Sequence, residues 1–444
     1  MKFLLSACYL LVSLSCQPKQ MTSYLGVPVS DIEKAVNNHL NDWFPRIVDF
    51  ENGGYYTNFE YNWERCADQH KMLVTQSRDL WTASKAAQLF PENEVYKNAA
   101  DHGFKFLTEQ MWDSTGGGFE LYHQPDKNDQ KTHYKLIYGN AFALFAFSEY
   151  SKINPSAEVF SWILKLVKWM DETAHDHEML GYYNIVLSEQ LKDNSTESLK
   201  LIAKIGWGNP AWKDQNTSIH LLEAFTTAYE VMPVPEIEMK LKEMLILVRD
   251  SMTQEDGSLK LYFTKNWQPI DYADSSRAFI MENHLFDHVS FGHNIETAYL
   301  LIDAAEKLYG KADEKTLLVA KKLTDHTLQH GFAPDYYGLF DKGYLFDGKM
   351  EIINRNKTWW SQAEALHTLA LMSQYFPEEE IYQQAFQQMW KYIQTDLYDH
   401  QFGGYYNNGL DETPGDREKR KAHNWKGPYH DGRALMKIWE YAKK

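Results

Sequence analysis

Cysteine is scarce in this sequence of 444 residues, which contains three. Two of them, Cys8 and Cys16, lie in the N-terminal segment MKFLLSACYLLVSLSC, where a basic start precedes a short apolar run and small residues. This pattern predicts a signal peptide over residues 1–16 that ends at a lipidated Cys16, followed by a tether over residues 17–24. Cleavage there would leave Cys66 as the single unmodified cysteine, so no disulfide bond is expected within the chain. We therefore expect an exported lipoprotein of the bacterial periplasm or cell envelope.

Positive charge and long apolar runs are also limited. The chain has 45 Lys and Arg against 61 Asp and Glu, which gives a formal net charge of −16. A surface of that sign repels phosphate backbones, so nucleic acid is not an expected partner. Beyond the N-terminal segment no apolar stretch reaches the ~18 residues of a membrane-spanning helix, so a membrane is expected to be contacted only through the lipid anchor.

The short motifs of several enzyme classes are missing. There is no glycine-rich phosphate loop, no dinucleotide-binding glycine pattern and no G-x-S-x-G nucleophile motif. His220, His293 and His430 could meet in space, but no H-E-x-x-H or comparably specific metal-ligand spacing is present. We therefore expect a site without a metal ion or a nicotinamide cofactor.

A glycine–aromatic pattern, by contrast, recurs six times along the chain. The copies lie at residues 53–56, 116–123, 181–184, 256–263, 330–338 and 403–409. Their spacing of about 60–76 residues is typical of a structural repeat. Because glycine permits tight turns and aromatic residues favour strands, each copy predicts a short β-hairpin link.

Two kinds of helical pattern alternate between these copies. Residues 136–150 are apolar on almost every side, as in a helix buried all round, whereas residues 155–172 have one apolar and one charged face. Further stretches of the first kind are 72–89, 216–231, 292–309, 359–375 and 430–442. Further stretches of the second kind are 31–44, 94–111, 236–250, 314–328 and 379–395. Twelve helices in six hairpins predict an all-α fold, an (α/α)6 barrel formed as one domain by residues 25–444.

Two long segments do not fit the repeat. Residues 174–214 and 264–290 are irregular and rich in Asp, Asn, Trp and Gly. Loops of that length inside a compact domain are usually functional or disordered. We expect them to cover the mouth of the barrel.

The predicted inner helices carry ionisable residues that a core does not need. His293 and Glu296 are three residues apart and therefore share one helix face, and His220 and Glu223 repeat that spacing. Any one of these groups could be a satisfied core residue. Burying three histidines, the arginine Arg78 and several glutamates around one cavity without a use would be costly. The pattern therefore predicts a polar site inside the barrel, in which Glu296 holds His293.

Five segments, in this order along the chain, resemble the N-acylglucosamine 2-epimerase superfamily. They are RDLW from residue 78, NTSIHLLEA from 216, GHNIE from 292, WWSQAEAL from 359 and WKGPYHDGR from 425. The resemblance covers residues 25–442 and comes closest to the cellobiose and mannobiose 2-epimerases. It implies an (α/α)6-barrel isomerase, without metal or nicotinamide, that inverts C2 of the reducing-end glucose or mannose unit of a β-1,4-linked disaccharide. A sugar is the expected partner, and we expect a monomer or weak dimer.

The resemblance also implies roles for individual residues. His293 and His430 match the acid/base pair, Arg78 the group that steadies the enolate oxygen, and Glu296 the partner that orients His293. His220 matches a residue implicated in ring opening. The expected substrate-binding residues are Asn216, Tyr138, Trp359, Trp360, Glu364, Trp425, Tyr299 and Glu223.

The expected reaction suits these residue types. Inverting C2 requires a proton to leave one face and return to the other, and histidine can serve as either base or acid near neutral pH. We expect one histidine to be neutral and the other protonated. Arginine stays protonated and can stabilise the enolate between the two steps.

Two positions depart from the disaccharide epimerases and leave alternatives open. Tyr299 stands where those enzymes usually carry Trp, and Asp431 where they usually carry Asn; both are expected to lie close to the sugar. A monosaccharide epimerase acting on N-acylglucosamine or mannose, or an aldose–ketose isomerase, is therefore the nearest alternative. A glycoside hydrolase needs only two carboxylates, but this leaves the histidines and the arginine without roles. A sugar-binding lipoprotein that supplies a transporter is a further alternative, which a turnover assay would separate.

Overall fold

A computed structural model describes residues 21–123, 134–188, 200 and 208–444 of the chain. The predicted signal peptide, its Cys16 and the first half of the predicted tether, residues 17–20, lie outside the described residues. The last two residues assigned to the tether form strand β1 (Ser23–Tyr24), which pairs with β2 (Val27–Pro28). Among the described helices, none has the length and hydropathy needed to cross a bilayer.

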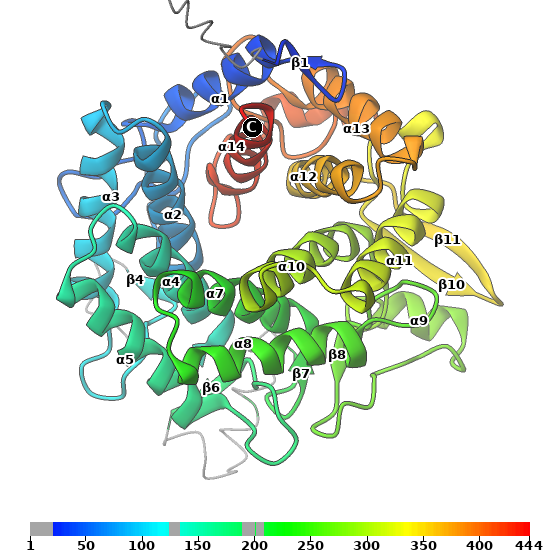
Figure 1. Cartoon of the computed structure of the whole chain (residues 1–444), viewed down its shortest axis with the longest axis horizontal. Helices are drawn as coiled ribbons and strands as arrows, with labels where there is room; N and C mark the ends of the chain where they lie inside the picture. Colours follow the sequence, from blue (N-terminus) through cyan, green and yellow to red (C-terminus); the bar gives the residue numbers. More distant parts are fainter. Residues whose placement is uncertain (1–20, 124–133, 189–199, 201–207) are drawn as a thin grey trace, which may run out of the picture.

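Two concentric rings of helices form the barrel (Figure 1). The inner ring consists of α2 (Leu73–Leu89), α4 (Ile137–Ser151), α7 (Gln215–Val231), α10 (Phe291–Tyr309), α12 (Trp359–Tyr375) and α14 (Tyr429–Ala442). The outer ring consists of α1 (Val29–Trp43), α3 (Glu94–Phe106), α5 (Ala157–Ala174), α8 (Pro235–Leu247), α11 (Glu314–His330) and α13 (Glu380–Tyr392). Each inner helix packs against the next, α14 closes the ring on α2, and α1 packs on α14. The predicted (α/α)6 barrel is confirmed, with each predicted helix in the expected ring.

The division into rings follows from where apolar residues lie on each helix. Every residue of α4 is buried, because this helix has neighbours on all sides. The outer helix α3 buries one face only, which includes Tyr96, Ala99 and Phe104. Outer helices also begin at residues that suit a helix start. Asn93 accepts a backbone N–H at the start of α3, and Ser156 does so at the start of α5.

Each outer helix leads into one of the six predicted links. Single antiparallel pairings close these links at Val48–Tyr55, Trp112–Phe119, His175–Tyr182, Thr253–Leu259, Phe332–Leu339 and Tyr398–Tyr405. In the first link Gly53 and Gly54 have φ angles of 80° and 66°, which other residues rarely adopt. An inner-helix side chain then fixes the link, because the Gln76 amide both accepts from and donates to the backbone of Tyr55.

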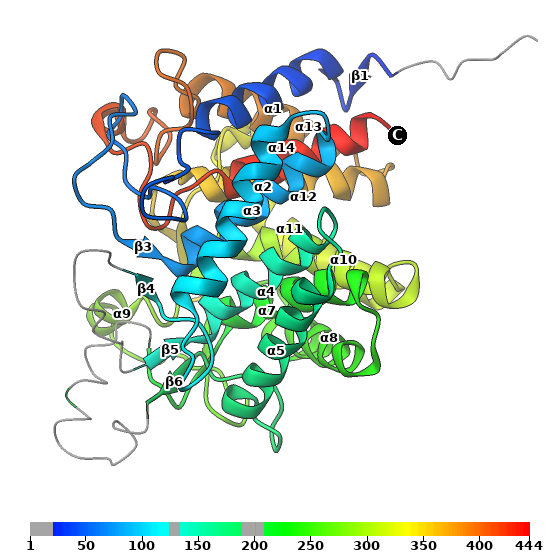
Figure 2. The same cartoon turned by 90° about the vertical axis from the view of Figure 1, so that its left-hand side faces the viewer.

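Short antiparallel strands gather at the end of the barrel where the inner helices begin (Figure 2). The pairs are β3 (Lys71–Met72) with β4 (Tyr122–His123), β5 (Tyr134–Leu136) with β6 (Ile185–Leu187), and β7 (Lys213–Asp214) with β8 (Tyr262–Phe263). A further sheet contains β9 (Val289–Ser290), β10 (Lys342–Phe346) and β11 (Lys349–Asn354). Strands β3, β5, β7 and β9 each run directly into an inner helix, so these strands place the first turns of α2, α4, α7 and α10 around one opening.

Shorter helical turns complete the chain. They are η1 (Leu107–Met111), η3 (Val248–Met252), η4 (Pro334–Tyr336), η5 (Ile393–Leu397) and η6 (Pro414–Glu418), together with helix α9 (Arg277–Asn283). Helix α9 and β9 lie in the segment 264–290 that was predicted to be irregular. Ile280 of α9 packs with Tyr344 and Phe346 of β10 in a small separate core. Parts of the other predicted irregular segment, residues 189–199 and 201–207, lie outside the described residues.

Candidate active site

A cavity of about 300 Å³ opens at the end of the barrel where the inner helices begin, and is called the front cavity below. Its lining residues are Arg78, Tyr138, Asn216, His220, His293, Glu296, Trp359, Trp360, Trp425 and His430. All ten belong to the thirteen site residues predicted from the sequence. The other three, Glu223, Tyr299 and Glu364, lie deeper in the barrel.

His293 is held by a residue that the sequence analysis did not identify. Its Nδ1 atom is hydrogen-bonded to Ser290 Oγ at 2.8 Å, and burial lowers the pKa of His293 well below its usual value. The prediction that Glu296 holds His293 is wrong in this structure, because the Glu296 carboxylate accepts from Arg433 at 2.8 Å. Side chains on a helix lean toward its N-terminus, so His293 meets the residue one turn before it rather than one turn after.

His430 is held by a carboxylate from the neighbouring inner helix. Its Nδ1 atom lies 2.5 Å from Glu364 Oε1, and Glu364 is fully buried. Glu364 was predicted to bind substrate, but it does not line the front cavity, and its contacts are with His430 and Arg433. Burial lowers the pKa of His430 well below its usual value, and the positive charge of Arg78 adds to this effect.

The third cavity histidine forms the pair expected from its spacing. His220 Nδ1 lies 2.9 Å from Glu223 Oε2 on α7. Burial alone would raise the pKa of Glu223, but the charge of Arg433 and the His220 contact outweigh it and lower the pKa to about 2. Glu223 therefore stays ionised and holds His220 from behind, without lining the front cavity.

Arg433 on α14 is the centre of the buried polar network and was missed as a site residue. Its guanidinium lies 2.8 Å from Glu296 and 2.6 Å from Glu364, and it also donates to Glu223. Three carboxylates from α7, α10 and α12 thus share one cation. Burial and the nearby Glu364 raise the pKa of Glu296 to about 7, so Glu296 can hold a proton near neutral pH. The signal available in the sequence was the spacing of His430 and Arg433, three residues apart on one helix face.

Arg78 presents a second guanidinium directly to the front cavity. It donates to the Tyr138 hydroxyl at 2.9 Å and lies 4.2 Å from the centre of the Phe142 ring. In the described ranges, no carboxylate lies within 4 Å of its nitrogens, so its charge is available to a ligand. An anionic oxygen bound beside it would be stabilised electrostatically.

Aromatic rings form another part of the front cavity. The Trp360 ring lies next to both acid/base candidates, with its centre 4.8 Å from that of His293 and 5.9 Å from that of His430. Trp359 lies beside it in sequence, and Trp425 is 39% exposed. Such rings suit the C–H faces of sugars.

Two expected sugar contacts lie elsewhere. Tyr299 was predicted to lie close to the sugar, but it lines a second cavity behind the Arg433 network, with its ring centre 5.3 Å from the Arg433 guanidinium carbon. The reason is its depth, since six residues along α10 from His293 correspond to about 9 Å of helix. Asp431 is buried outside the front-cavity lining, and burial raises its pKa to about 8.

One buried group could be read as a metal site. The ligand atoms of Glu296, Glu364 and His430 lie within 4.8 Å of one another. The Arg433 guanidinium, however, contacts both carboxylates. A fixed protein cation therefore occupies the position that a metal ion would take, and these residues do not fit a metal.

Comparison with known proteins identifies one family and several related proteins. A profile of the N-acylglucosamine 2-epimerase (GlcNAc 2-epimerase) family matches residues 54–430. The cellobiose 2-epimerase of Dictyoglomus turgidum is 26% identical over 424 residues, which cover 93% of this chain and 98% of that protein. The structure of the cellobiose 2-epimerase from Bacillus thermoamylovorans B4167 matches with a TM-score of 0.77 at 24% identity, covering 93% and 99% of the two chains. A D-mannose isomerase structure matches with a TM-score of 0.78 at 21% identity, covering 93% and 98%. At these identities the two structures show the fold alone.

Proposed function

The chain belongs to the N-acylglucosamine 2-epimerase family and is an isomerase, and from this premise we propose that it inverts C2 of the reducing-end glucose or mannose unit of a β-1,4-linked disaccharide. One observation carries the proposed chemistry. His293 and His430 come from different helices, line the same cavity and each have Nδ1 held by a fixed partner. The choice of a disaccharide of the cellobiose or mannobiose type rests on the relatives named as cellobiose 2-epimerases.

The proposed reaction moves one proton off C2 and another onto it. After ring opening, to which His220 contributes, Nε2 of one histidine removes the C2 proton and the electron pair passes to the C1 oxygen, forming an enolate. Arg78 stabilises this oxygen, a kind of contact whose loss typically costs ~3–4 kcal/mol in the barrier. The other histidine, carrying a proton drawn from solvent, returns it to the opposite face of C2.

The protonation state of the free protein differs from the one expected from sequence. Burial lowers the pKa of both His293 and His430, so both rings are neutral near pH 7 before substrate binds. Either ring can therefore act as the base. The negative charge of the enolate then raises the pKa of the second imidazole and favours its protonation. We expect kcat/KM to stay level through about pH 6.5, the usual pKa of histidine, and to fall only well below it, which a pH profile will measure.

The aromatic residues support a sugar substrate. Trp360 lies next to both histidines, and the ring of the reacting sugar unit is expected to pack on it. Trp425, partly exposed, is placed to contact the second sugar unit. This arrangement suits a linked disaccharide whose reducing end reaches into the barrel.

NMR spectroscopy of cellobiose and β-1,4-mannobiose incubated with the purified protein in deuterated water tests the proposal. We expect the C2 epimer, with deuterium at C2. His293→Ala and His430→Ala should each stop epimerisation, although the remaining histidine can still exchange the C2 proton of the epimer that it faces. His400→Ala is the matched control, because His400 is exposed and, among the described residues, its ring is hydrogen-bonded only to the backbone oxygen of Gln394.

Other results would replace the proposal. Epimerisation without deuterium uptake contradicts the two-histidine route. A ketose as the only product, formed from free mannose, favours the aldose–ketose isomerase alternative, in line with the structural likeness to a D-mannose isomerase. Cleavage of the glycosidic bond would reassign Glu296 and Glu364 as a hydrolase pair.

Two further proposals concern the state of the protein in the cell. We propose that it is exported and lipidated at Cys16, which labelling with a fatty-acid analogue tests, since Cys16→Ala should remove the label. We also propose a monomer or weak dimer, which sedimentation velocity tests.

A further inference from the structure

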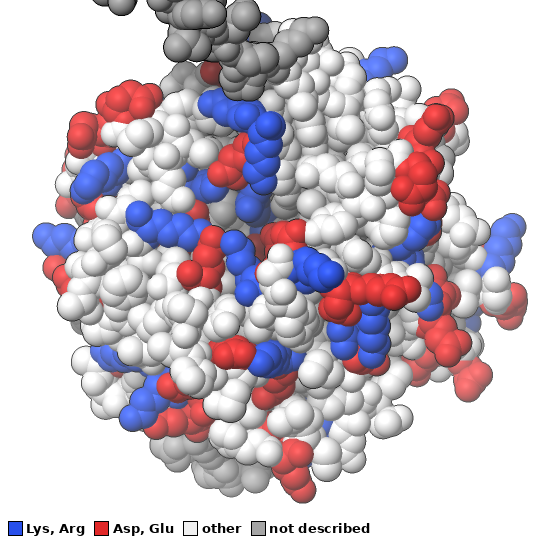
Figure 3. Space-filling view, viewed as in Figure 1, with Lys and Arg blue, Asp and Glu red and all other residues white. Residues whose placement is uncertain are grey.

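A second cavity of about 300 Å³ opens at the opposite end of the barrel, where the inner helices end, and is called the rear cavity below. This end faces the viewer in Figure 1, and Figure 3 shows a hollow there bordered by charged side chains. Glu223, Tyr299 and Arg433 line its inner end. Because Glu223 and Arg433 also contact His220 and Glu296, this layer of side chains separates the rear cavity from the front one.

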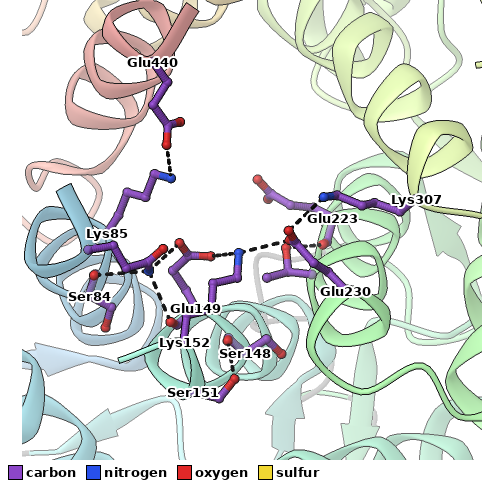
Figure 4. Close-up of polar contacts among 12 residues, drawn as sticks. Ser84, Lys85, Ser148, Glu149, Ser151, Lys152, Glu223, Glu230, Lys307 and Glu440 are labelled. Carbon is purple, nitrogen blue, oxygen red and sulfur yellow. Dashed lines mark hydrogen bonds and ion pairs between the residues drawn. The ribbon is translucent and has the colours of Figure 1, made fainter. Parts of the chain in front are cut away.

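The mouth of the rear cavity is a chain of ion pairs between inner helices (Figure 4). Lys85 of α2 pairs with Glu440 of α14 at 2.7 Å. Lys152 of α4 pairs with Glu230 of α7 at 3.0 Å, and Glu230 also pairs with Lys307 of α10 at 2.8 Å. These charges satisfy one another, so the mouth links neighbouring helices without needing a ligand.

Deeper polar groups do not have partners of this kind. In the part of the chain that the structure describes, Asp303 and Lys437 attract each other but form no ion pair within 4 Å and no hydrogen bond. The indole N–H of Trp81, which is 3% exposed, and Nδ1 of His367, which is fully buried, have no hydrogen-bond partner there. All four residues line the rear cavity. Trp81 and His367 are buried, whereas Asp303 and Lys437 are partly buried beside them. Buried polar groups are almost always paired, so the two unpaired buried atoms, together with a carboxylate and an ammonium group that form no ion pair among the described residues, indicate a ligand that pairs with them.

The charge balance and the rings identify the chemistry of that ligand. The lining contains six Lys or Arg and six Asp or Glu, so the cavity favours neither an anion nor a cation. Trp81, Phe145 and Tyr441 add aromatic surface. A carboxylate, an ammonium group and an indole N–H beside aromatic rings match the hydroxyl groups and C–H faces of a sugar ring. We propose that the rear cavity is a second binding site, which takes a neutral polyhydroxylated molecule the size of one sugar ring.

This assignment does not depend on the proposed reaction, and the test separates the two sites. The probe is methyl β-D-glucopyranoside, whose methylated anomeric oxygen prevents ring opening and therefore turnover. Its binding to the full chain is measured by saturation-transfer NMR. In Trp360→Ala, which damages the front cavity, we expect binding at the rear cavity to persist.

Charge-balanced variants then test the rear cavity itself. In the Trp360→Ala background, Asp303→Asn with Lys437→Met keeps the net charge and should weaken binding at least about tenfold, because hydrogen bonds to charged groups are lost. Lys168→Met with Glu172→Gln removes an exposed pair on α5 in the same way and should leave binding unchanged. Without the Trp360→Ala change, the Asp303 and Lys437 double variant should keep its turnover of disaccharide, because neither residue lines the front cavity.

Three results would overturn the proposal. Loss of all binding in Trp360→Ala would place the probe in the front cavity alone. Undiminished binding in the Asp303→Asn, Lys437→Met variant would exclude the rear cavity. Inorganic phosphate binding in place of the glycoside would contradict a neutral ligand. If the double variant does not fold, Trp81→Phe keeps the proposal testable, since removing the indole N–H should still weaken binding.

Discussion

Removing the guanidinium of Arg433 should destabilise the protein more than almost any other charge removal. Arg433 is 2% exposed and contacts Glu223, Glu296 and Glu364, all of them buried. Arg433→Met keeps the length of the side chain but leaves three carboxylates without their cation. Breaking a buried ion pair in this way typically costs ~3–5 kcal/mol, so we expect the free energy of unfolding at pH 7 to fall by about that amount.

The loss should depend on pH in a direction that the structure dictates. Glu223 has a pKa of about 2 in the folded protein and a usual value of 4.5, so it contributes stability that is present above pH 4.5 and lost as the pH falls toward 2. Without Arg433, burial instead raises the carboxyl pKa values above 4.5. A buried carboxyl whose pKa is raised above its unfolded value contributes stability that is present at low pH. This stability is lost as the pH rises through the folded pKa, because the group must then ionise without a cation beside it. The difference between wild type and variant should therefore be largest at pH 7–8 and smaller near pH 5.

Urea unfolding followed by far-ultraviolet circular dichroism at pH 5, 7 and 8 measures this difference. Arg277→Met is the matched control, because Arg277 pairs with Glu351 at the surface, where its side chain is 59% exposed. Loss of such a pair costs ~0–1 kcal/mol. A loss in Arg433→Met no larger than that of the control, or a difference that stays constant from pH 5 to pH 8, would refute the reasoning.

Three other predictions concern single features. Ser290→Ala removes the hydrogen bond to His293. If that bond positions the ring with about 1 kcal/mol, its loss should lower kcat about fivefold. A wild-type kcat would show that this bond does not position the ring. Treatment with EDTA should leave turnover intact, because the Arg433 guanidinium occupies the place between Glu296 and Glu364. Activity that EDTA removes and Zn²⁺ restores would contradict this prediction. Burial lowers the pKa of His39 from 6.5 to about 4, so its contribution to stability is present above pH 6.5 and lost as the pH falls toward 4. In His39→Gln the urea midpoint should therefore fall less steeply as the pH is lowered from 6.5 to about 4. An equally steep fall would show that protonation of His39 does not limit stability in acid.

Much of the fold could be predicted because its signals are local and repeated. Residues 136–150 are apolar on almost every side and residues 155–172 on one face, which is enough to separate α4 from α5. The glycine–aromatic copies marked all six links. Helix α9 and the β10–β11 hairpin were not predicted, because their small core joins Ile280 to Tyr344 across a long stretch of sequence.

The sequence predicted which side chains face the inside of the barrel, but not how deep along the barrel axis each one lies. A spacing of three residues placed His293 and Glu296 on one side of a helix, yet it could not tell which neighbour each would bond. That depends on the packing of α10 against α12 and of α12 against α14, which brings Glu296 to Arg433. Tyr299 shares the inner side of the same helix but lies beyond the Arg433 network. Its distance from the substrate depends on the helix register in the barrel, which no local pattern reveals.

The contact of α1 with α14 has a consequence for how activity arises during synthesis. The barrel closes through residues at opposite ends of the chain: His39 bonds the backbone oxygen of Pro428, 389 positions away, and Asp42 accepts from the backbone of Gly404. Contacts of such separation form late, because a very long loop must close first. The helix that closes the ring also carries His430 and Arg433. A nascent chain therefore has no complete site until its final helix docks, and any opening of that seam removes a candidate catalytic histidine and the central cation together. The complete site and the closed ring of helices therefore form together, in one cooperative event.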